Sequence, residues 1–365
     1  MKIIIAVPDF TREAHLKKIL PGLLNDLAKK GSRYKDMEIL IGTGLHAQPT
    51  KKEIRYNLGN IAGKVKISSH DYKNVFCAGR SKSNIPVYLD KKIKNADSII
   101  TVGVVEPHLY AGYSGGVKVL SIGMAGEKTI NATHHPRFLD HPGTKICSIK
   151  NNPFQEFIQE AASALPVKYS VNIINNEAGE ILKIFKGKPG PCFRKAVSYS
   201  KRVFEKNLNK YLDIIICGIP SSKSVNIYQA SRAFNYVINA GSPVIKDTSL
   251  ILVKAGLEEG FGKGLGEKRF MKKMLKMECP DKLINEVKKG GCLAGEHRAY
   301  MVAKALRKAS LGFISKNARL YKNKGLPFLF FEDVTEAKKY IRKIFKKPEI
   351  HYLKNAFTTV LTRAE

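Results

Sequence analysis

Short apolar runs alternate with helical patterns along the first half of the chain. Apolar runs over residues 2–7, 37–43 and 64–69 predict buried strands, and residues 15–29 follow the period of an amphipathic helix. The run at 97–105, DSIITVGVV, is rich in β-branched residues, so we expect a strand that is buried on both faces. This alternation favours β-α-β units and a mainly parallel sheet.

The pattern continues and then restarts further along the chain. The expected elements are a helix at 153–164, a strand at 170–174, a loop at 186–192, a helix at 194–207, strands at 213–217, 249–253, 311–315 and 327–331, and a helix at 333–345. We therefore predict an α/β fold of two Rossmann-like domains, with mainly parallel sheets and an active-site cleft between the domains.

The chain of 365 residues is long enough for two domains, each with its own core. We expect residues 1–210 to form an N-terminal catalytic and cofactor-binding domain and residues 211–345 to form a C-terminal α/β domain. Residues 346–365 form a C-terminal segment whose apolar run can pack on either domain, including back on the first. No apolar run approaches the ~18 residues of a membrane span, and the start of the chain lacks the pattern of a signal peptide.

Composition adds a strong positive charge. The chain has 63 lysines and arginines against 31 acidic residues, a formal net charge of +32. The basic residues are spread along the whole chain without a nucleic-acid-binding motif, so we expect a general surface bias that attracts anionic substrates rather than nucleic acid. The six cysteines stand singly, which is typical of a protein of the reducing cytoplasm. No pattern specifies an oligomeric state.

The richest chemistry follows the strand at 97–105. His108 comes just past the strand end, where open α/β sheets present ligand-binding groups. The glycine-rich turn after it contains Ser114, Gly115 and Gly116 and can offer backbone N–H groups to an anion such as phosphate. Such turns are also common without a ligand, and this spacing matches neither the P-loop nor the dinucleotide fingerprint.

Two further groups can join this turn. Lys118 can neutralise a phosphate or, when deprotonated, act as a nucleophile or covalent anchor. His134 can return to the same site from a later turn. A single histidine is more often structural than catalytic, so these residues gain weight only in combination.

The ends of the first two strands carry polar residues as well. Asp9 and Arg12 follow the first strand, and His46 follows the second. If the sheet is parallel, these side chains and His108 emerge at one edge. An arginine fork suits a substrate carboxylate, and two histidines suit proton transfer at two faces of a bound molecule. The alternative for Asp9 and Thr11 is capping of the following helix.

Together these motifs resemble the nickel-pincer lactate racemase family. The likeness runs through D-x-T-R at 9–12, G-x-H at 44–46, E-x-H-x-x-A-G-x-S-G-G-x-K at 106–118 with its trailing His134, and N-I-Y-Q-A at 226–230. It covers nearly the whole chain in order.

The resemblance implies a cofactor and a set of residue roles. A nickel-pincer nucleotide, which is a nicotinate-derived mononucleotide with two sulfurs that grip nickel, would be attached covalently to Lys118. His134 would supply the protein ligand to nickel, although the adjacent His135 could exchange roles with it. Asp9 and Thr11, with Ser114, Gly115 and Gly116 of the turn, would hold the nucleotide.

The resemblance also implies a reaction. One of His46 and His108 would take the hydroxyl proton of a 2-hydroxy acid while hydride moves from its α-carbon to the cofactor, and the other would return a proton after the hydride returns to the opposite face. The substrate carboxylate would be bound by Arg12, Gln229 and Arg232, beside Tyr228. The enzymes that synthesise the cofactor would be transient partners.

Some positions depart from the family pattern and leave alternatives open. Arg232 replaces a lysine, Val117 replaces an arginine, and the chain has no tryptophan where lactate-type enzymes place one near 294–304. His297 and Arg298 occupy that neighbourhood and suit a larger or more anionic substrate than lactate. We therefore expect a racemase or epimerase of a 2-hydroxy acid. The alternative is a non-catalytic carrier or binder of the pincer nucleotide or of an anionic metabolite.

Overall fold

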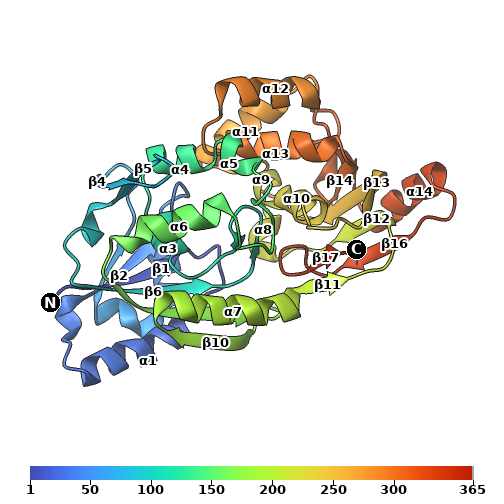
Figure 1. Ribbon diagram of the computed structural model, residues 1–365. Coiled ribbons are helices and arrows are strands. Elements are labelled where there is room, and N and C mark those ends of the chain that lie inside the picture. Colours follow the sequence, from blue (N-terminus) through green and yellow to red (C-terminus); the bar gives the residue numbers. More distant parts are fainter. Residues whose placement is uncertain (364–365) are drawn as a thin grey trace. The chain divides into compact units, whose positions relative to one another are not determined.

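The computed structural model describes residues 1–363, and its contacts divide them into two compact units (Figure 1). Unit 1 comprises Met1–Glu106, Tyr113–Thr133 and Ile149–Val203, and unit 2 comprises Pro107–Gly112, His134–Ser148 and the chain from Phe204 on. Two short excursions therefore carry His108 and His134 into unit 2, while the glycine turn between them belongs to unit 1. We describe each unit by itself.

The sheet of unit 1 has the strand order β10-β9-β6-β1-β2-β3. Its strands are β1 (Ile3–Pro8), β2 (Met37–Gly42), β3 (Lys66–Ser69), β6 (Ser98–Val104), β9 (Val167–Asn175) and β10 (Ile181–Gly187). All neighbours pair in parallel except β10, which runs antiparallel to β9. The parallel strands follow the order 3-2-1-4-5 of a Rossmann-like sheet, whose strand order reverses between β1 and β6.

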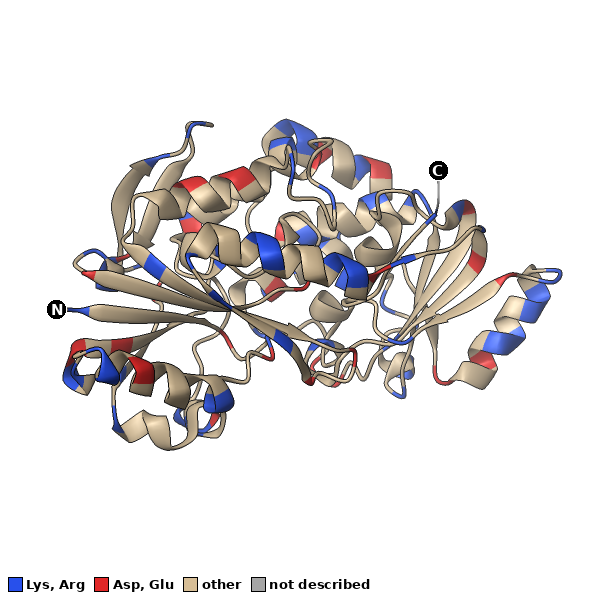
Figure 2. Cartoon of the chain, turned by 60° about the horizontal axis from the view of Figure 1, so that its bottom comes forward, with Lys and Arg blue, Asp and Glu red and all other residues tan. Residues whose placement is uncertain are grey.

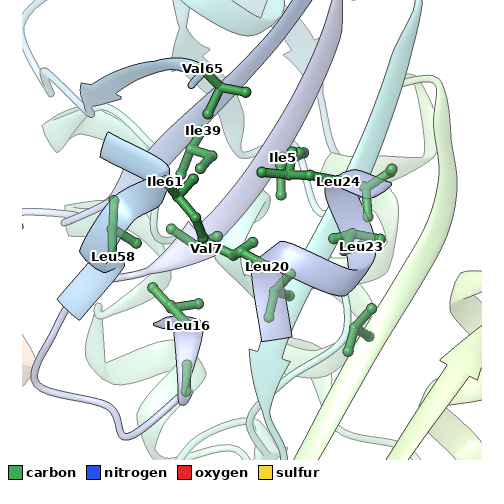
Figure 3. Close-up of a cluster of buried hydrophobic side chains, with 14 of the residues drawn as sticks. Ile5, Val7, Leu16, Leu20, Leu23, Leu24, Ile39, Leu58, Ile61 and Val65 are labelled. Atoms are coloured by element: carbon green, nitrogen blue, oxygen red, sulfur yellow. The ribbon is translucent and has the colours of Figure 1, made fainter. Parts of the chain in front are cut away.

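Helices and a hairpin complete unit 1. They are α1 (Leu16–Lys29), α2 (Lys51–Leu58), α3 (Lys118–Ser121), α4 (Glu127–Thr133), α6 (Pro153–Ser163), α7 (Pro189–Phe204) and the antiparallel pair β4 (Val75–Arg80) and β5 (Pro86–Asp90). Ile5 and Val7 lie two residues apart on one face of β1 and pack against Leu20 and Leu23 of α1 (Figure 3). Pairing with β2 and β6 places β1 in the centre of the sheet, and this packing covers one of its faces.

The sheet of unit 2 is entirely parallel, with the order β15-β14-β13-β12-β16. Its strands are β12 (Leu212–Cys217), β13 (Ile245–Lys254), β14 (Ser310–Ile314), β15 (Leu329–Phe331) and β16 (Ile350–Leu353). Its helices are α5 (Pro136–Leu139), α8 (Ser221–Ser224), α9 (Ile227–Ala230), α10 (Arg232–Ile238), α11 (Leu265–Leu275), α12 (Pro280–Gly290), α13 (Glu296–Leu306) and α14 (Val334–Ile344). Ile214, Ile216, Leu250 and Leu252 of the sheet form a core with Ile341 of α14.

Short elements complete the fold. They are the strand pairs β7 (Pro107–His108) with β8 (Gly112–Tyr113) and β11 (Glu205–Asn207) with β17 (Val360–Thr362), and the 3-10 helices η1 (Tyr34–Asp36), η2 (Gly59–Gly63), η3 (Lys91–Ile93) and η4 (Ala318–Leu320). The predicted α/β class with mainly parallel sheets is confirmed. The divisions at residues 210 and 345 stay a prediction about domains.

One predicted element is wrong. The segment 186–192, expected as a loop from its glycines and prolines, contains the end of β10 and the start of α7. Pro189 is the first residue of α7, where a backbone N–H would have no partner within the helix, and Pro191 also lies in the first turn. The same helix, expected to reach residue 207, ends at Phe204, and β11 follows it.

Charged residues are spread over the described part of the chain. Lysines and arginines lie on elements of both units, interspersed with acidic residues (Figure 2). No helix in the described part of the chain combines the length and apolarity that crossing a bilayer requires.

Candidate functional site

A polar cluster lies at the carboxyl ends of the central strands of unit 1. Asp9 follows β1, and its Oδ1 accepts hydrogen bonds from the Thr11 hydroxyl at 2.6 Å and the Thr11 backbone N–H at 3.2 Å. Helix α1 begins at Leu16, and no side chain caps it. The alternative that Asp9 and Thr11 cap this helix is therefore wrong, because their bonds close the loop between β1 and α1 instead.

His46 is oriented by Asp9. Its Nδ1 lies 2.5 Å from Oδ2 of Asp9, so Nδ1–H donates to the carboxylate in this arrangement. The other ring nitrogen, Nε2, then carries the lone pair. A histidine whose Nδ1–H is held by a carboxylate is the arrangement of a general base.

Arg12 forms an ion pair with Glu106, the second residue after β6. This pair joins the ends of β1 and β6, where the strand order of the sheet reverses and where such sheets bind ligands. Both side chains remain partly exposed. The Arg12 guanidinium, which was predicted to bind a substrate carboxylate, is thus already paired with the carboxylate of Glu106.

The glycine turn of unit 1 has a packing role of its own. The Ser114 hydroxyl donates to Val104 O at 2.7 Å, and the Gly116 N–H donates to Asn172 Oδ1 at 2.7 Å. Gly115 has a φ of 89°, and a Cβ there would come within 2.4 Å of Val105. Two groups of the expected phosphate cradle are therefore committed to the protein. Lys118, half-buried, begins α3 directly after this turn.

In unit 2, His108 has a different hydrogen-bond arrangement from His46. Its Nδ1 accepts the backbone N–H groups of Tyr110 at 3.3 Å and Ala111 at 3.2 Å. The neutral ring then carries its proton on Nε2, which makes Nε2 a donor. Tyr236 of α10 holds the same loop, because its hydroxyl donates to Pro107 O at 3.0 Å.

Three rings meet in unit 2, of which Tyr110 and His297 are buried and His134 is half-buried. The ring centroids of His134 and His297 lie 4.6 Å apart, and the Tyr110 ring lies 5.7 Å from His134 and 5.9 Å from His297. Burial lowers the pKa of His297 well below its ordinary value, and the charges of His134 and Arg298 lower it further, so this ring is neutral. The adjacent His135 caps α5, where its Nδ1 accepts the Arg137 N–H.

The predicted substrate residues of unit 2 also meet. Asn226 caps α9 and accepts the Gln229 N–H at 2.9 Å, which fixes the start of this short helix. Arg232 Nη1 donates to Gln229 Oε1 at 3.2 Å, and the Arg232 guanidinium lies over the Phe357 ring at 5.4 Å. Tyr228 lies under the guanidinium of Arg298 at 5.3 Å.

The structure therefore groups most of the predicted residues, within one unit or the other. Asp9, Thr11, Arg12 and His46 meet in unit 1, and Gln229 and Arg232 meet in unit 2. Two residues of these clusters had no predicted role: Glu106 and Tyr110. Both belong to the E-x-H-x-Y pattern after β6, so their position directly past a buried strand was the available signal.

The chain is similar in sequence to proteins of known family. Residues 1–146 match the family described as lactate racemase N-terminal domain. The chain is 27% identical over 292 residues to the lactate racemase of Thermoanaerobacterium thermosaccharolyticum, which covers 78% of this chain and 66% of the relative. It is 26% identical over 270 residues to the lactate racemase of Lactiplantibacillus plantarum, which covers 71% of this chain and 61% of the relative. The matches thus span no more than about two thirds of these relatives.

Solved structures show the same fold. The lactate racemase apoprotein of T. thermosaccharolyticum superposes with a TM-score of 0.87 at 22% identity, over 99% of this chain and 86% of that one. A protein of Thermotoga maritima superposes with a TM-score of 0.77 at 14% identity, over 100% of this chain and 94% of that one.

Proposed function

Starting from the chain's confirmed resemblance to the lactate racemase family, we propose that it is a racemase or epimerase of a small anionic 2-hydroxy acid. The observation that carries this proposal is the Asp9–His46 pair at 2.5 Å beside the Arg12–Glu106 pair. It supplies an oriented base at the ligand-binding edge of a Rossmann-like sheet.

The proton-transfer roles follow from the ring nitrogens. His46 would accept the substrate hydroxyl proton at Nε2, while Asp9 stabilises the imidazolium that forms. His108 would be the second proton-transfer group, acting through Nε2. Because its Nδ1 accepts two backbone N–H bonds, His108 begins as a donor, so the two histidines start in opposite roles.

The resemblance implies a nickel-pincer nucleotide, and the donor set can be tested against it. Within residues 1–363, no three histidine, cysteine or carboxylate side chains gather as a metal site made by the protein alone. A nickel ion held by His134 would take its other ligands from a cofactor, and a pincer with two sulfurs brings them. When bound, this cofactor would accept the α-hydride of the substrate and return it.

The other cofactor residues fit to different degrees. Lys118 is half-buried and directly follows the glycine turn, which suits a covalent tether. Asp9 and Thr11 lie at the ligand-binding edge. Ser114 and Gly116 would act by shaping the turn with Gly115 rather than by donating to a phosphate, since both already bond within unit 1.

Substrate recognition would involve Arg12, Tyr228, Gln229 and Arg232. Gln229 and Arg232 are already joined and buried or half-buried, so they form a ready carboxylate site in unit 2. Arg12 would have to share its guanidinium between the substrate and Glu106. We also propose transient contact with the cofactor-synthesis enzymes and a cytoplasmic location.

The test uses chain produced together with the cofactor-synthesis enzymes. We expect added mass on Lys118, bound nickel, and racemisation of at least one acid among lactate, malate, phenyllactate and sugar acids. With deuterium on the α-carbon, the label should stay in the product, because hydride transfer does not exchange it with water. K118A made in the same cells is the control and should carry no added mass. Absence of both added mass and nickel from the wild-type chain would contradict the proposal.

Two contacts favour a second candidate function, which is a non-catalytic carrier or binder of the nucleotide or of an anionic metabolite. Arg12 is already paired with Glu106, and His108 presents a donor rather than a base. A loaded chain that holds the cofactor but inverts no member of the acid panel would support this function. Any stereochemical turnover that depends on His46 would exclude it.

A further inference from the structure

Arg298 is a buried cation without an acid. It is the third residue of α13, is 7% exposed, and its Nε and Nη1 atoms have no hydrogen-bond partner within residues 1–363. No carboxylate in the described part of the chain forms an ion pair with it. A guanidinium does not lose its proton at any physiological pH, so Arg298 stays charged in this buried position.

Its contacts with the protein compensate for burial only in part. The guanidinium lies over the Tyr228 ring, 5.3 Å from the centroid, and donates a hydrogen bond to the Tyr228 hydroxyl. A buried donor that lacks an acceptor is costly, and a buried charge without a counter-charge is more so. An anionic ligand would remove both costs.

The start of α13 reinforces the positive potential around Arg298. This helix has 11 residues, and the N–H of its N-cap residue Gly295 donates to His297 Nδ1 at 3.0 Å. The positive end of the helix dipole therefore lies in the same turn as the unpaired guanidinium. The two features favour a negative group at this position.

Arg298 and Arg232 act on the same two side chains. The positive charges of both arginines lower the pKa of His297, after the larger effect of its burial, and both also act on Tyr110. Nη1 of Arg232 is bonded to Gln229, and Nε and Nη1 of Arg298 have no hydrogen-bond partner within residues 1–363. Unit 2 therefore offers two cationic groups around one cluster of rings.

We propose that Arg298 binds the second carboxylate of the substrate, which makes the substrate a 2-hydroxy dicarboxylate. This inference rests on the proposed function. Gln229 and Arg232 receive the carboxylate next to the hydroxyl-bearing carbon, and Arg298 receives the one at the far end of the molecule. Lactate, with one carboxylate, leaves Arg298 unpaired and so binds more weakly. A carboxylate of the cofactor is the other source of the same chemistry, and the experiment separates the two.

The experiment measures binding by calorimetry on the full-length chain without cofactor. The ligands are malate, 2-hydroxyglutarate and lactate at equal ionic strength, and the proteins are wild type, R298Q, R298K and R307Q. We expect the better dicarboxylate to bind wild type at least about tenfold more tightly than lactate, since charge-assisted hydrogen bonds are the strong ones. R298Q should remove this difference and leave lactate binding within about twofold.

Two further variants control the result. R298K should retain part of the preference, because it keeps the charge but not the planar fork. R307Q makes the same change on an exposed arginine at the end of the same helix, where Arg307 pairs with Asp281, and should change nothing. Equal binding of lactate and both dicarboxylates to wild type would overturn the proposal, whether or not R298Q folds.

Further outcomes separate the sources of the carboxylate and the two proposals. If R298Q binds all three acids like wild type but takes up less cofactor on loading, Arg298 serves the cofactor and the substrate assignment is overturned. If loaded wild type binds a dicarboxylate through Arg298 but inverts none, the racemase function fails and the Arg298 site stands. If it inverts lactate at a rate that R298Q does not change and ignores dicarboxylates, the function stands and the site fails.

Discussion

The two polar clusters of this molecule treat charge in opposite ways. In unit 1 the basic groups have acidic partners: Arg12 pairs with Glu106, His46 with Asp9, and the fully buried His70 with Asp90. In unit 2, Arg298 lies buried with two nitrogens unsatisfied among the described residues, beside a neutral His297. The basic groups of the first cluster have their acidic partners within the protein, whereas Arg298 in the second cluster requires an external anion as its partner.

This difference indicates a division of labour. Internal pairs hold side chains in fixed positions before a ligand arrives, which suits groups that must be oriented for proton transfer. An unpaired buried cation costs stability in the free protein, and this cost is recovered when an anion binds. We therefore interpret the Asp9–His46 pair of unit 1 as a source of oriented proton transfer, and Arg298 of unit 2 as a source of anion affinity.

The largest expected effect comes from removing the oriented base of unit 1. H46N should lower the rate of racemisation by the loaded enzyme by about 100- to 10,000-fold, which is the usual contribution of a general base. Chiral chromatography of the product measures it. H141N, which makes the same change at an exposed histidine, should keep full activity. A loaded H46N that works at the wild-type rate would move the base elsewhere.

Next in size is the buried pair of unit 1. Both side chains of His70 and Asp90 are 0% exposed, with His70 Nδ1 2.8 Å from Asp90 Oδ2 and His70 Nε2 3.0 Å from Ala125 O. D90N should lower the free energy of unfolding by about 3 kcal/mol, because an amide weakens the buried hydrogen bonds that the carboxylate makes with His70 and with the Asp71 and Lys92 N–H groups. Urea denaturation followed by circular dichroism measures this. D281N, at an exposed ion pair, should leave stability unchanged.

The same pair predicts a pH dependence. Burial raises the pKa of Asp90, but the hydrogen bonds from His70 and from the Lys92 and Asp71 N–H groups outweigh it, so the pKa lies below its ordinary value. A carboxyl with a lowered pKa contributes stability above its unfolded-state pKa and loses it as the pH falls through the folded-state pKa. The stability difference between wild type and D90N should therefore shrink below about pH 4. A difference that is constant from pH 7 to pH 3 would contradict this.

Sequence predicted the unit 1 cluster better than the unit 2 cluster for a physical reason. The strands β1, β2 and β6 are continuous apolar runs, and parallel strands bring their carboxyl ends to one edge, so Asp9, Arg12 and His46 could be placed together. Glu106 was not assigned as the partner of Arg12, because that contact depends on β6 lying next to β1. Strand order is set by packing and is not contained in the alternation of elements.

Arg298 illustrates what the sequence did not determine. The sequence places Arg298 in the segment 294–304, but whether an arginine in a helix is exposed or buried depends on the packing around α13. The sequence pattern predicted no helix between residues 208 and 332, so neither α13 nor the helices packed around it could be inferred. An unpaired cation is recognisable only once its neighbours are known.

A smaller effect is expected from making the unit 1 cluster resemble that of unit 2. E106Q removes the acid that pairs with Arg12 and should lower the free energy of unfolding by about 1 kcal/mol, since the pair is only partly buried. It should also increase lactate binding, because Arg12 becomes available to an external carboxylate. E278Q, which breaks an exposed pair with Lys282, is the matched control and should do neither. Unchanged lactate affinity in E106Q would mean that Arg12 has no part in anion binding.

An effect of similar size but opposite sign tests the other half of the comparison. R298M replaces the buried guanidinium with an apolar side chain and should raise the free energy of unfolding of the ligand-free chain by about 1 kcal/mol, because a buried charge without a partner is removed. The same variant should lose the rise in melting temperature that a dicarboxylate gives wild type, whereas R307M should keep it. If R298M is instead less stable than wild type and dicarboxylates protect both equally, then contacts such as that with Tyr228 already satisfy Arg298. The two clusters would in that case differ in composition but not in their need for a ligand.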